Sequence, residues 1–469
     1  MLTVAIVLFF VTTLLIVQVA IRNRPLKLYR PLDDDDVPFP AAGQASTVFS
    51  LAALFGCYPG IFLLIGGIGF VGVAGGSAAA LLLIRAAQAG HEGGYETFLE
   101  DFRDRFRDTG TFFFALFILQ IGFAISELVF LRVVLLLAFG LSPSTASYAA
   151  LAVAVVGYCY CLTGGYNTVF RTDIVQLLTV AGMCLLLLGA LATSLSLPEF
   201  LTAAGAKMVH HGGYWTAGFF RWSWVERILD FSSGFLLGFA FLLVSPDTWK
   251  RVYIVSRVPS RRGISLLFVA AAFPFVAITP LVLALPNLPH GVVDPTVFLQ
   301  RLAGNRILLG ATLIGVFASF LSSFDSALIA ATHVSLLSAR RARPALEELD
   351  RFRYLAALHF VIVSLVFVIG SRFGNPGIMA TILMGTYPVL GGLLIGTRAG
   401  TRNLPSGAFG LVFLLGCVAW IVFTMSDEMR FEVGRTTDLN FVPAAGCVLL
   451  ASAAMSWILS WIPQQREDE

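Results

Sequence analysis

Apolar runs of about 20 residues recur along the whole chain, separated by short polar stretches. Each run is long enough to cross a hydrocarbon layer roughly 30 Å thick as a helix. About thirteen such spans are predicted, near residues 2–21, 45–67, 69–88, 111–140, 146–163, 173–196, 228–246, 263–286, 306–338, 353–371, 376–397, 405–425 and 440–462. The pattern therefore predicts an all-α, multi-pass membrane protein that forms a single transporter-like domain.

Two of these spans carry helix-breaking residues at comparable depth. The second span is interrupted by Gly56, Pro59 and Gly60, and the seventh contains the serines and glycines of the segment 232–238. Broken helices survive in a membrane only where they line a cavity. A matching pair in two halves of a chain indicates an inverted-repeat transporter with its binding site at the breaks. The alternative is two ordinary kinks.

This symmetry divides the chain into a first helix, two repeats of five spans and extra helices. The predicted bounds are 2–21 for the first helix, 45–196 and 228–397 for the repeats, and 405–462 for the extra helices. The expected fold is a five-plus-five inverted-repeat, LeuT-like core with broken second and seventh helices.

Composition agrees with the span pattern. Of 469 residues, 57% are hydrophobic and 13% are charged, and the mean hydropathy of +0.84 excludes a water-soluble protein of ordinary composition. The sequence shows no metal-ligand cluster, nucleophile elbow or phosphate loop, so an enzyme is not expected, and nucleic acid is not an expected partner.

The basic residues predict the orientation of the chain. They concentrate in the loops after the first, third, seventh, ninth and eleventh spans, as Arg22, Arg24, Lys27, Arg30, Arg85, Arg103, Arg105, Arg107, Lys250, Arg251, Arg257, Arg261, Arg262, Arg340, Arg341, Arg343, Arg398 and Arg402. By the positive-inside rule these loops are cytoplasmic. The N-terminus is then outside a cell (inner or plasma) membrane and the C-terminus is in the cytoplasm.

The ninth span contains five polar residues in an otherwise apolar sequence. They are Ser319, Ser322, Ser323, Asp325 and Ser326. Spacings of three and four place the four serines on one side of the helix, with Asp325 near Ser322. Hard oxygen ligands suit a small alkali cation, and an intramembrane carboxylate indicates function by default. Alternatively, the serines stabilise helix contacts and Asp325 bonds a neighbouring backbone.

Two further acids lie within or at the start of apolar spans. Asp173 opens the sixth span after a predicted turn at Gly164 and Gly165, where Thr172 or Asp173 would also be explained as a plain helix cap. Glu127 lies near the middle of the fourth span, about two turns from Gln120 on the same face. Arg132 lies on a different face, nearer the outer end, where it would extend outward rather than pair with Glu127.

Four strings resemble motifs of the sodium:solute symporter family, which includes sodium-coupled sugar, proline, pantothenate and sialic acid carriers. In chain order they are TFLEDFRDRF at 97–106, GGYNTVFRTDIVQ at 164–176, DTWKRVYIVS at 247–256 and SSFDSAL at 322–328. The resemblance covers nearly the whole chain. It implies a thirteen-helix inverted-repeat fold that works by alternating access with Na⁺ as the coupling ion.

The resemblance also implies which residues bind cations. The sodium site would use the backbone carbonyls of Ala53, Gly56 and Ser319 and the hydroxyls of Ser322 and Ser323. The acid of the family signature corresponds to Asp173, on the sodium path or in a second cation site. Because Ser322, Asp325 and Ser326 are expected to face it, a second, weaker cation site is a further hypothesis.

The solute is expected beside the helix breaks. Its predicted lining is Tyr58, Phe123, Glu127, Gly238 and Phe241, the last corresponding roughly to an aromatic that screens the substrate from the cytoplasm in some relatives. Glu127 would receive an ammonium group, which slightly favours an amino-acid-like solute. Alternatively, Glu127 bonds only within the helix bundle.

Two other functions remain open at this point. A symporter-like membrane domain also occurs as a sensor module, although no cytoplasmic output domain is expected here. A proton-coupled carrier would use Asp173, Asp325 or Glu127 as the titrating group. The predicted function is sodium-coupled uptake of a small polar organic solute across the lipid bilayer.

Overall fold

The structure is a computed structural model of the full chain. The structure describes residues 75–76, 78–79, 82–83, 109–139, 141–194, 224–249, 306–342, 348–373, 382–383, 385–399, 404–405, 407–425 and 441–461. The predicted residues Ala53, Gly56 and Tyr58 lie outside the described residues, as do the spans predicted at 2–21, 45–67 and 263–286.

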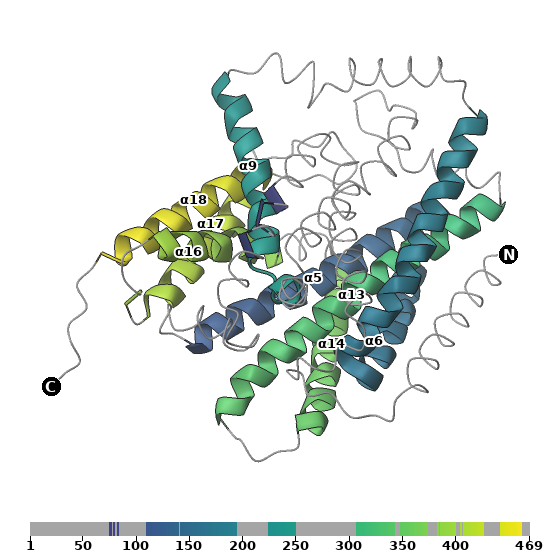
Figure 1. The fold of residues 1–469 in the computed structure, drawn as a ribbon, viewed down its shortest axis with the longest axis horizontal. Coiled ribbons are helices and arrows are strands. Elements are labelled where there is room, and N and C mark those ends of the chain that lie inside the picture. The colour runs from purple at the N-terminus through teal and green to yellow at the C-terminus, as the bar shows by residue number, and fades with distance from the viewer. Residues whose placement is uncertain are drawn as a thin grey trace, which may run out of the picture.

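The described part of the chain consists of helices and contains no strand. Figure 1 shows their arrangement. The helices are α5 (Thr109–Phe139), α6 (Pro143–Ser194), α9 (Trp224–Leu243), α13 (Arg306–Ala342), α14 (Glu348–Phe373), α16 (Thr386–Ala399), α17 (Ala408–Met425) and α18 (Phe441–Leu459). The predicted all-α class is confirmed, whereas the number of spans and the inverted repeat stay predictions.

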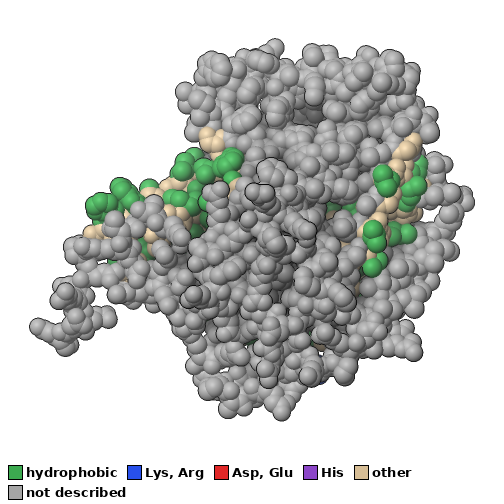
Figure 2. Space-filling view, in the orientation of Figure 1, with side chains coloured by type: hydrophobic (Ala, Val, Ile, Leu, Met, Phe, Trp, Pro, Cys, Tyr) green, Lys and Arg blue, Asp and Glu red, His purple; other side chains and the backbone are tan. Residues whose placement is uncertain are grey.

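Several described helices are long and apolar enough to cross a membrane. They contain the segments Gly110–Leu136, Leu313–Leu336 and Arg353–Arg372. The lipid-facing side of α14 is visible as a stripe of exposed apolar side chains at spacings of three and four, namely Leu358, Val361, Leu365 and Ile369. Figure 2 shows hydrophobic side chains on the outer flanks of the molecule. Such stripes are stable in contact with lipid tails rather than water.

Helix α6 covers both the fifth and the sixth predicted spans without a break in its helical assignment. In a straight helix, Gly157 and Met183 would be about 39 Å apart. Gly157 packs on Leu321 of α13 and Met183 packs on Gly315, and these two positions are only about 9 Å apart along α13. The helix must therefore bend back on itself.

The order of these contacts shows where the direction changes. From Gly157 to Cys161, the partner on α13 moves forward from Leu321 to Asp325, but from Asp173 to Met183 it moves backward from Ser322 to Gly315. The reversal lies between Cys161 and Asp173, where the sequence predicts a turn. Both arms of α6 consequently lie along α13 (Figure 1).

Helix α9 differs from the expected broken seventh helix. It is continuous through Ser232–Gly238 and ends at Leu243, followed by a bend at Val244 and Ser245 and one further helical turn. Glycine weakens a helix by only about 1 kcal/mol, which packing readily offsets. Gly234 and Gly238 are both buried, so the segment is stabilised as a helix by its neighbours.

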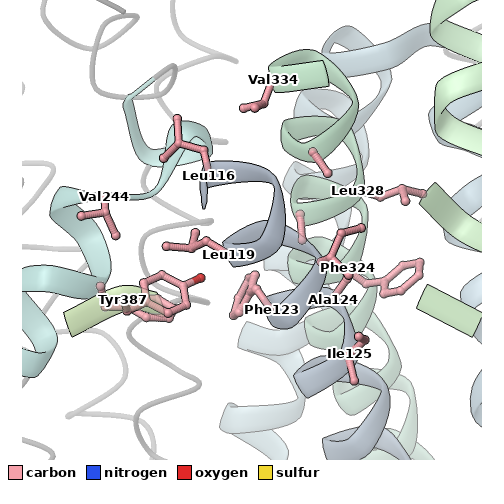
Figure 3. Close-up of a cluster of buried hydrophobic side chains, with 14 of the residues drawn as sticks. Leu116, Leu119, Phe123, Ala124, Ile125, Val244, Phe324, Leu328, Val334 and Tyr387 are labelled. Carbon is pink, nitrogen blue, oxygen red and sulfur yellow. The ribbon is translucent and has the colours of Figure 1, made fainter. Parts of the chain in front are cut away.

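The core is formed around α13, which packs against both α5 and α6. Figure 3 shows buried side chains of both α5 and α13 in this core, among them Ala124 and Ile125 of α5 and Phe324 and Leu328 of α13. The middle of α13 is buried on all sides, from Phe320 to Val334. A helix surrounded in this way holds its polar side chains away from lipid and in fixed positions.

His359 links α14 to α13 through both ring nitrogens. Its Nδ1 lies 3.1 Å from Thr332 Oγ1 and its Nε2 lies 3.2 Å from Ser335 Oγ. The Thr332 hydroxyl donates to the Leu328 carbonyl, so it accepts from His359. His359 is thereby assigned as the neutral tautomer with hydrogen on Nδ1, and Ser335 donates to Nε2.

Replacing His359 with alanine is expected to destabilise the α13–α14 contact by about 2–4 kcal/mol, because two hydrogen bonds and a ring contact with Phe117 at 4.9 Å are lost. Thermal unfolding of the purified protein would measure the change. The control is Leu365→Ala on the lipid-facing side of the same helix, which should change the melting temperature little. Equal effects of the two substitutions would contradict the assigned role.

Candidate functional site

The serine-rich stretch of α13 lies in the buried middle of that helix. Ser322 and Asp325 are fully buried, Ser323 and Ser326 are nearly so, and Ser319 is half-buried. The packing of α5 and both arms of α6 around α13 causes this burial. Because hydroxyls and carboxylates are costly in a dry interior, a fold that buries this many on adjacent turns indicates a polar site.

Asp173 faces this stretch from the second arm of α6. The hydroxyl of Ser322 donates to Asp173 Oδ1 at 2.8 Å, and both residues are fully buried. Asp173 lies inside α6 and not at its start, so it is not the cap of a new helix. Thr172 bonds locally instead, with its hydroxyl donating to the Val169 carbonyl at 3.0 Å. The structure thus brings Ser322 and Asp173 together across 149 residues of sequence.

Two further predicted ligands are adjacent on α13. The Ser323 hydroxyl donates to the Ser319 carbonyl at 3.3 Å. A carbonyl oxygen and a hydroxyl oxygen therefore lie side by side, one turn from Ser322. Both oxygens would coordinate a cation bound here, with the hydroxyl hydrogen turned away from the ion.

Asp325 and Ser326 complete the polar face of α13. The backbone carbonyl of Asp325 accepts from the thiol of Cys161, at an S···O distance of 3.8 Å, on the first arm of α6. Asp325 is fully buried and lies about one turn from Ser322 on α13, in the region where the sequence predicts a second cation site.

All the candidate ligands in this cluster are oxygen atoms. Among the described residues there is no group of three or more His, Cys, Asp or Glu side chains with metal-binding geometry. A set of hydroxyl, carbonyl and carboxylate oxygens suits a hard cation rather than a transition metal.

Two of the predicted solute residues, Phe123 and Phe241, lie in a second cluster made by α5, α9 and α16. The ring of Phe123 meets Phe241 edge to face, with centroids 5.5 Å apart. Phe241 is stacked on Tyr387 at 4.5 Å. Tyr387 is fully buried and is labelled with Phe123 in Figure 3, where its hydroxyl end points toward α5. We call Phe123, Phe241 and Tyr387 the aromatic cluster.

Glu127 and Gly238 adjoin this cluster. Glu127 is 5% exposed and lies one turn from Phe123 on α5, while Gly238 is buried nearly one turn before Phe241 on α9. Arg132, five residues further along α5, donates from its Nε to Ser147 Oγ at 2.9 Å. Tyr387 was not predicted from the sequence, because a tyrosine within an apolar run has no distinctive pattern around it.

Comparison with known proteins gives one clear result. No family model matches the chain, and no curated protein matches it. The chain is similar to the solved structure of a Na⁺-coupled sialic acid symporter in a substrate-bound, outward-open state, with a TM-score of 0.68 and 14% identity. The match covers 99% of this chain and 98% of the other.

At this level of identity the match shows the fold. The chain shares the fold of that membrane protein. That structure is described as revealing a novel Na⁺ site, a statement that concerns the sialic acid symporter itself. The sodium:solute symporter family stays a prediction for this chain.

Proposed function

We propose that this protein is a secondary active transporter that couples the inward movement of Na⁺ to the uptake of a small polar organic solute by alternating access. One observation carries the proposal: the fully buried hydrogen bond between Ser322 of α13 and Asp173 of α6, which places a hydroxyl and a carboxylate oxygen side by side in the interior. The match to a Na⁺-coupled symporter supports it.

The main cation site would consist of the carbonyls of Ala53, Gly56 and Ser319 and the hydroxyls of Ser322 and Ser323. The pairing of Ser323 with the Ser319 carbonyl supports the α13 half of this set. A second, weaker site would use Asp173, Asp325 and Ser326. Since Ser322 belongs to the first set and donates to Asp173 of the second, it would contact both cations or pass one ion from the first site to the second.

Coupling follows from the position of the ligands on separate helices. A cation that bridges the second span and α13 stabilises only the arrangement in which those helices are close, and its differential affinity for that arrangement drives the population shift. A membrane potential of 100 mV adds roughly 2.3 kcal/mol for each charge that moves inward. The gradient then supplies the energy for solute accumulation.

The test uses purified protein in two formats. In detergent without solute, NaCl is expected to raise the melting temperature relative to equal choline chloride or KCl, because Na⁺ binds only the folded state. In liposomes, an inward Na⁺ gradient is expected to drive uptake in a screen of amino acids, carboxylates and sugars. Uptake that ignores Na⁺ but follows a pH gradient would replace this proposal with proton coupling, and an absence of both effects would favour a sensor.

A further inference from the structure

Two buried polar side chains of α5 flank the aromatic cluster. Gln120 is 1% exposed and Glu127 is 5% exposed. Gln120, Phe123 and Glu127 follow one another at spacings of three and four, so they lie on one face of the helix. This face therefore presents an amide, an aromatic ring and a carboxylate in a row.

The amide group of Gln120 is the unusual member of this row. Within the described residues, no acceptor lies within hydrogen-bonding distance of its Nε2 atom. A buried amide donor without an acceptor costs about 1–3 kcal/mol. An acceptor supplied by a ligand would recover this energy, and an amide NH₂ group is suited to a carboxylate or carbonyl oxygen.

Glu127, at the other end of the row, is suited to a positively charged group. The carboxylate of Glu127 lies one turn from Phe123, whose ring touches Phe241. A carboxylate beside aromatic rings is the combination that recognises an ammonium group, by charge and by cation–π attraction. Glu127 is 5% exposed, so an ammonium group bound to it would be held away from water.

The separation of the two polar groups selects the ligand. Gln120 and Glu127 are about 10.5 Å apart along the helix axis, and their side chains are nearly equal in length. Hydrogen bonds of about 2.9 Å at each end leave roughly 5 Å between the two polar ends of a ligand placed between them. An α-amino acid, in which one carbon separates the two groups, is too short.

We propose that the solute is an ω-amino acid, with its ammonium group on Glu127, its carboxylate on Gln120 and its methylene chain against the ring of Phe123. This inference rests on the proposed function, because it names the solute of the same transporter. Tyr387 supports the cluster through its stacking on Phe241.

The experiment measures binding by thermal shift in NaCl with a series of increasing chain length: glycine, β-alanine, γ-aminobutyrate, δ-aminovalerate and ε-aminocaproate. Affinity is expected to be highest for γ-aminobutyrate or δ-aminovalerate. n-Butylamine, which lacks the carboxylate, should bind about tenfold or more weakly than γ-aminobutyrate. Equal or tighter binding of α-amino acids, or equal binding of the amine, would overturn the proposal.

Two variants separate the roles of the ends. Gln120→Leu should weaken γ-aminobutyrate about tenfold to a hundredfold and leave n-butylamine unchanged, whereas Glu127→Gln should weaken both. Phe130→Leu, on an exposed part of α5, is the matched control. Should Gln120→Leu fold poorly, Gln120→Glu provides the same discrimination, because it repels the carboxylate.

The melting-temperature shift caused by NaCl alone separates the solute proposal from the sodium proposal. If NaCl stabilises the protein but no ω-amino acid binds, the solute class is wrong and the sodium proposal stands. If NaCl has no effect, the proposed function itself fails.

Discussion

Replacing Ser322 with alanine is expected to lower the apparent Na⁺ affinity by about tenfold to a hundredfold and to abolish uptake at ordinary sodium concentrations. The substitution removes a cation ligand. It also removes the hydrogen bond to Asp173 and leaves that carboxylate buried without its 2.8 Å donor. The measurement is the Na⁺ concentration that gives half of the maximal thermal shift, followed by Na⁺-driven uptake in liposomes.

The control for this prediction is Ser364→Ala. Ser364 also has an inward-facing hydroxyl on a membrane helix, but its Oγ has no hydrogen-bond partner among the described residues, so its loss should leave Na⁺ affinity unchanged. Asp173→Asn provides a second check. If the two groups act together, Ser322→Ala and Asp173→Asn should be clearly non-additive. Additive effects, or wild-type affinity in Ser322→Ala, would contradict the site.

Much of the fold was predictable from hydrophobicity alone. The runs at 111–140, 306–338 and 353–371 correspond closely to α5, α13 and α14, because a continuous apolar stretch of this length has no alternative to a helix in lipid. The hairpin formed by the two arms of α6 was harder to predict from the sequence. Its glycines indicated a turn, but only contacts with α13 reveal that both arms pack on the same helix.

The seventh helix shows why residue type alone misplaces a break. The glycines at 234 and 238 predicted an interruption, yet α9 continues to Leu243 and bends two residues later. Intrinsic propensity is a weak determinant when tertiary packing stabilises a helix. The bend occurs instead beside Pro246, which restricts the preceding Ser245 to non-helical backbone.

Some contacts among the candidate residues were predictable where these residues stand out in the apolar spans. Ser322 and Asp173 were expected to face one another, and they do so at hydrogen-bonding distance. Phe123 and Phe241 were expected in one lining, and their rings touch. Tyr387 and His359 were not identified, since their roles depend on which helices become neighbours, and helix periodicity carries no information about that.

The contact between α16 and α18 depends on two glycines of α16. Gly392 and Gly396 are one turn apart on α16, in the small-xxx-small pattern that lets membrane helices approach closely. A Cβ atom at Gly392 would lie 2.8 Å from Ser452 Cβ, and one at Gly396 would lie 2.9 Å from the Ala453 carbonyl carbon. Both contacts are shorter than real Cβ atoms show, and the second involves the backbone of α18.

Replacing Gly396 with leucine is therefore expected to separate α16 from α18 and to lower stability by about 3 kcal/mol or more, since backbone cannot move aside as a side chain can. The clash would also displace Ser456, whose hydroxyl donates to the carbonyls of Ser452 and Ala453. The measurement is the melting temperature of the purified protein together with the yield of monodisperse material.

The matched control for the α16 substitution is Gly189→Leu in α6. Gly189 is also a helical glycine in an apolar segment, but it is exposed and a Cβ atom there meets nothing within 4 Å. Leucine also has a higher helix propensity than glycine, so the control should be neutral or slightly stabilising. A melting temperature for Gly396→Leu equal to that of Gly189→Leu would show that α16 and α18 do not approach closely. A loss of stability confined to Gly396→Leu identifies the glycine face as the contact that holds α18 against α16. Gly391 of α16 packs on Ala240, so the same helix also connects α18 to α9.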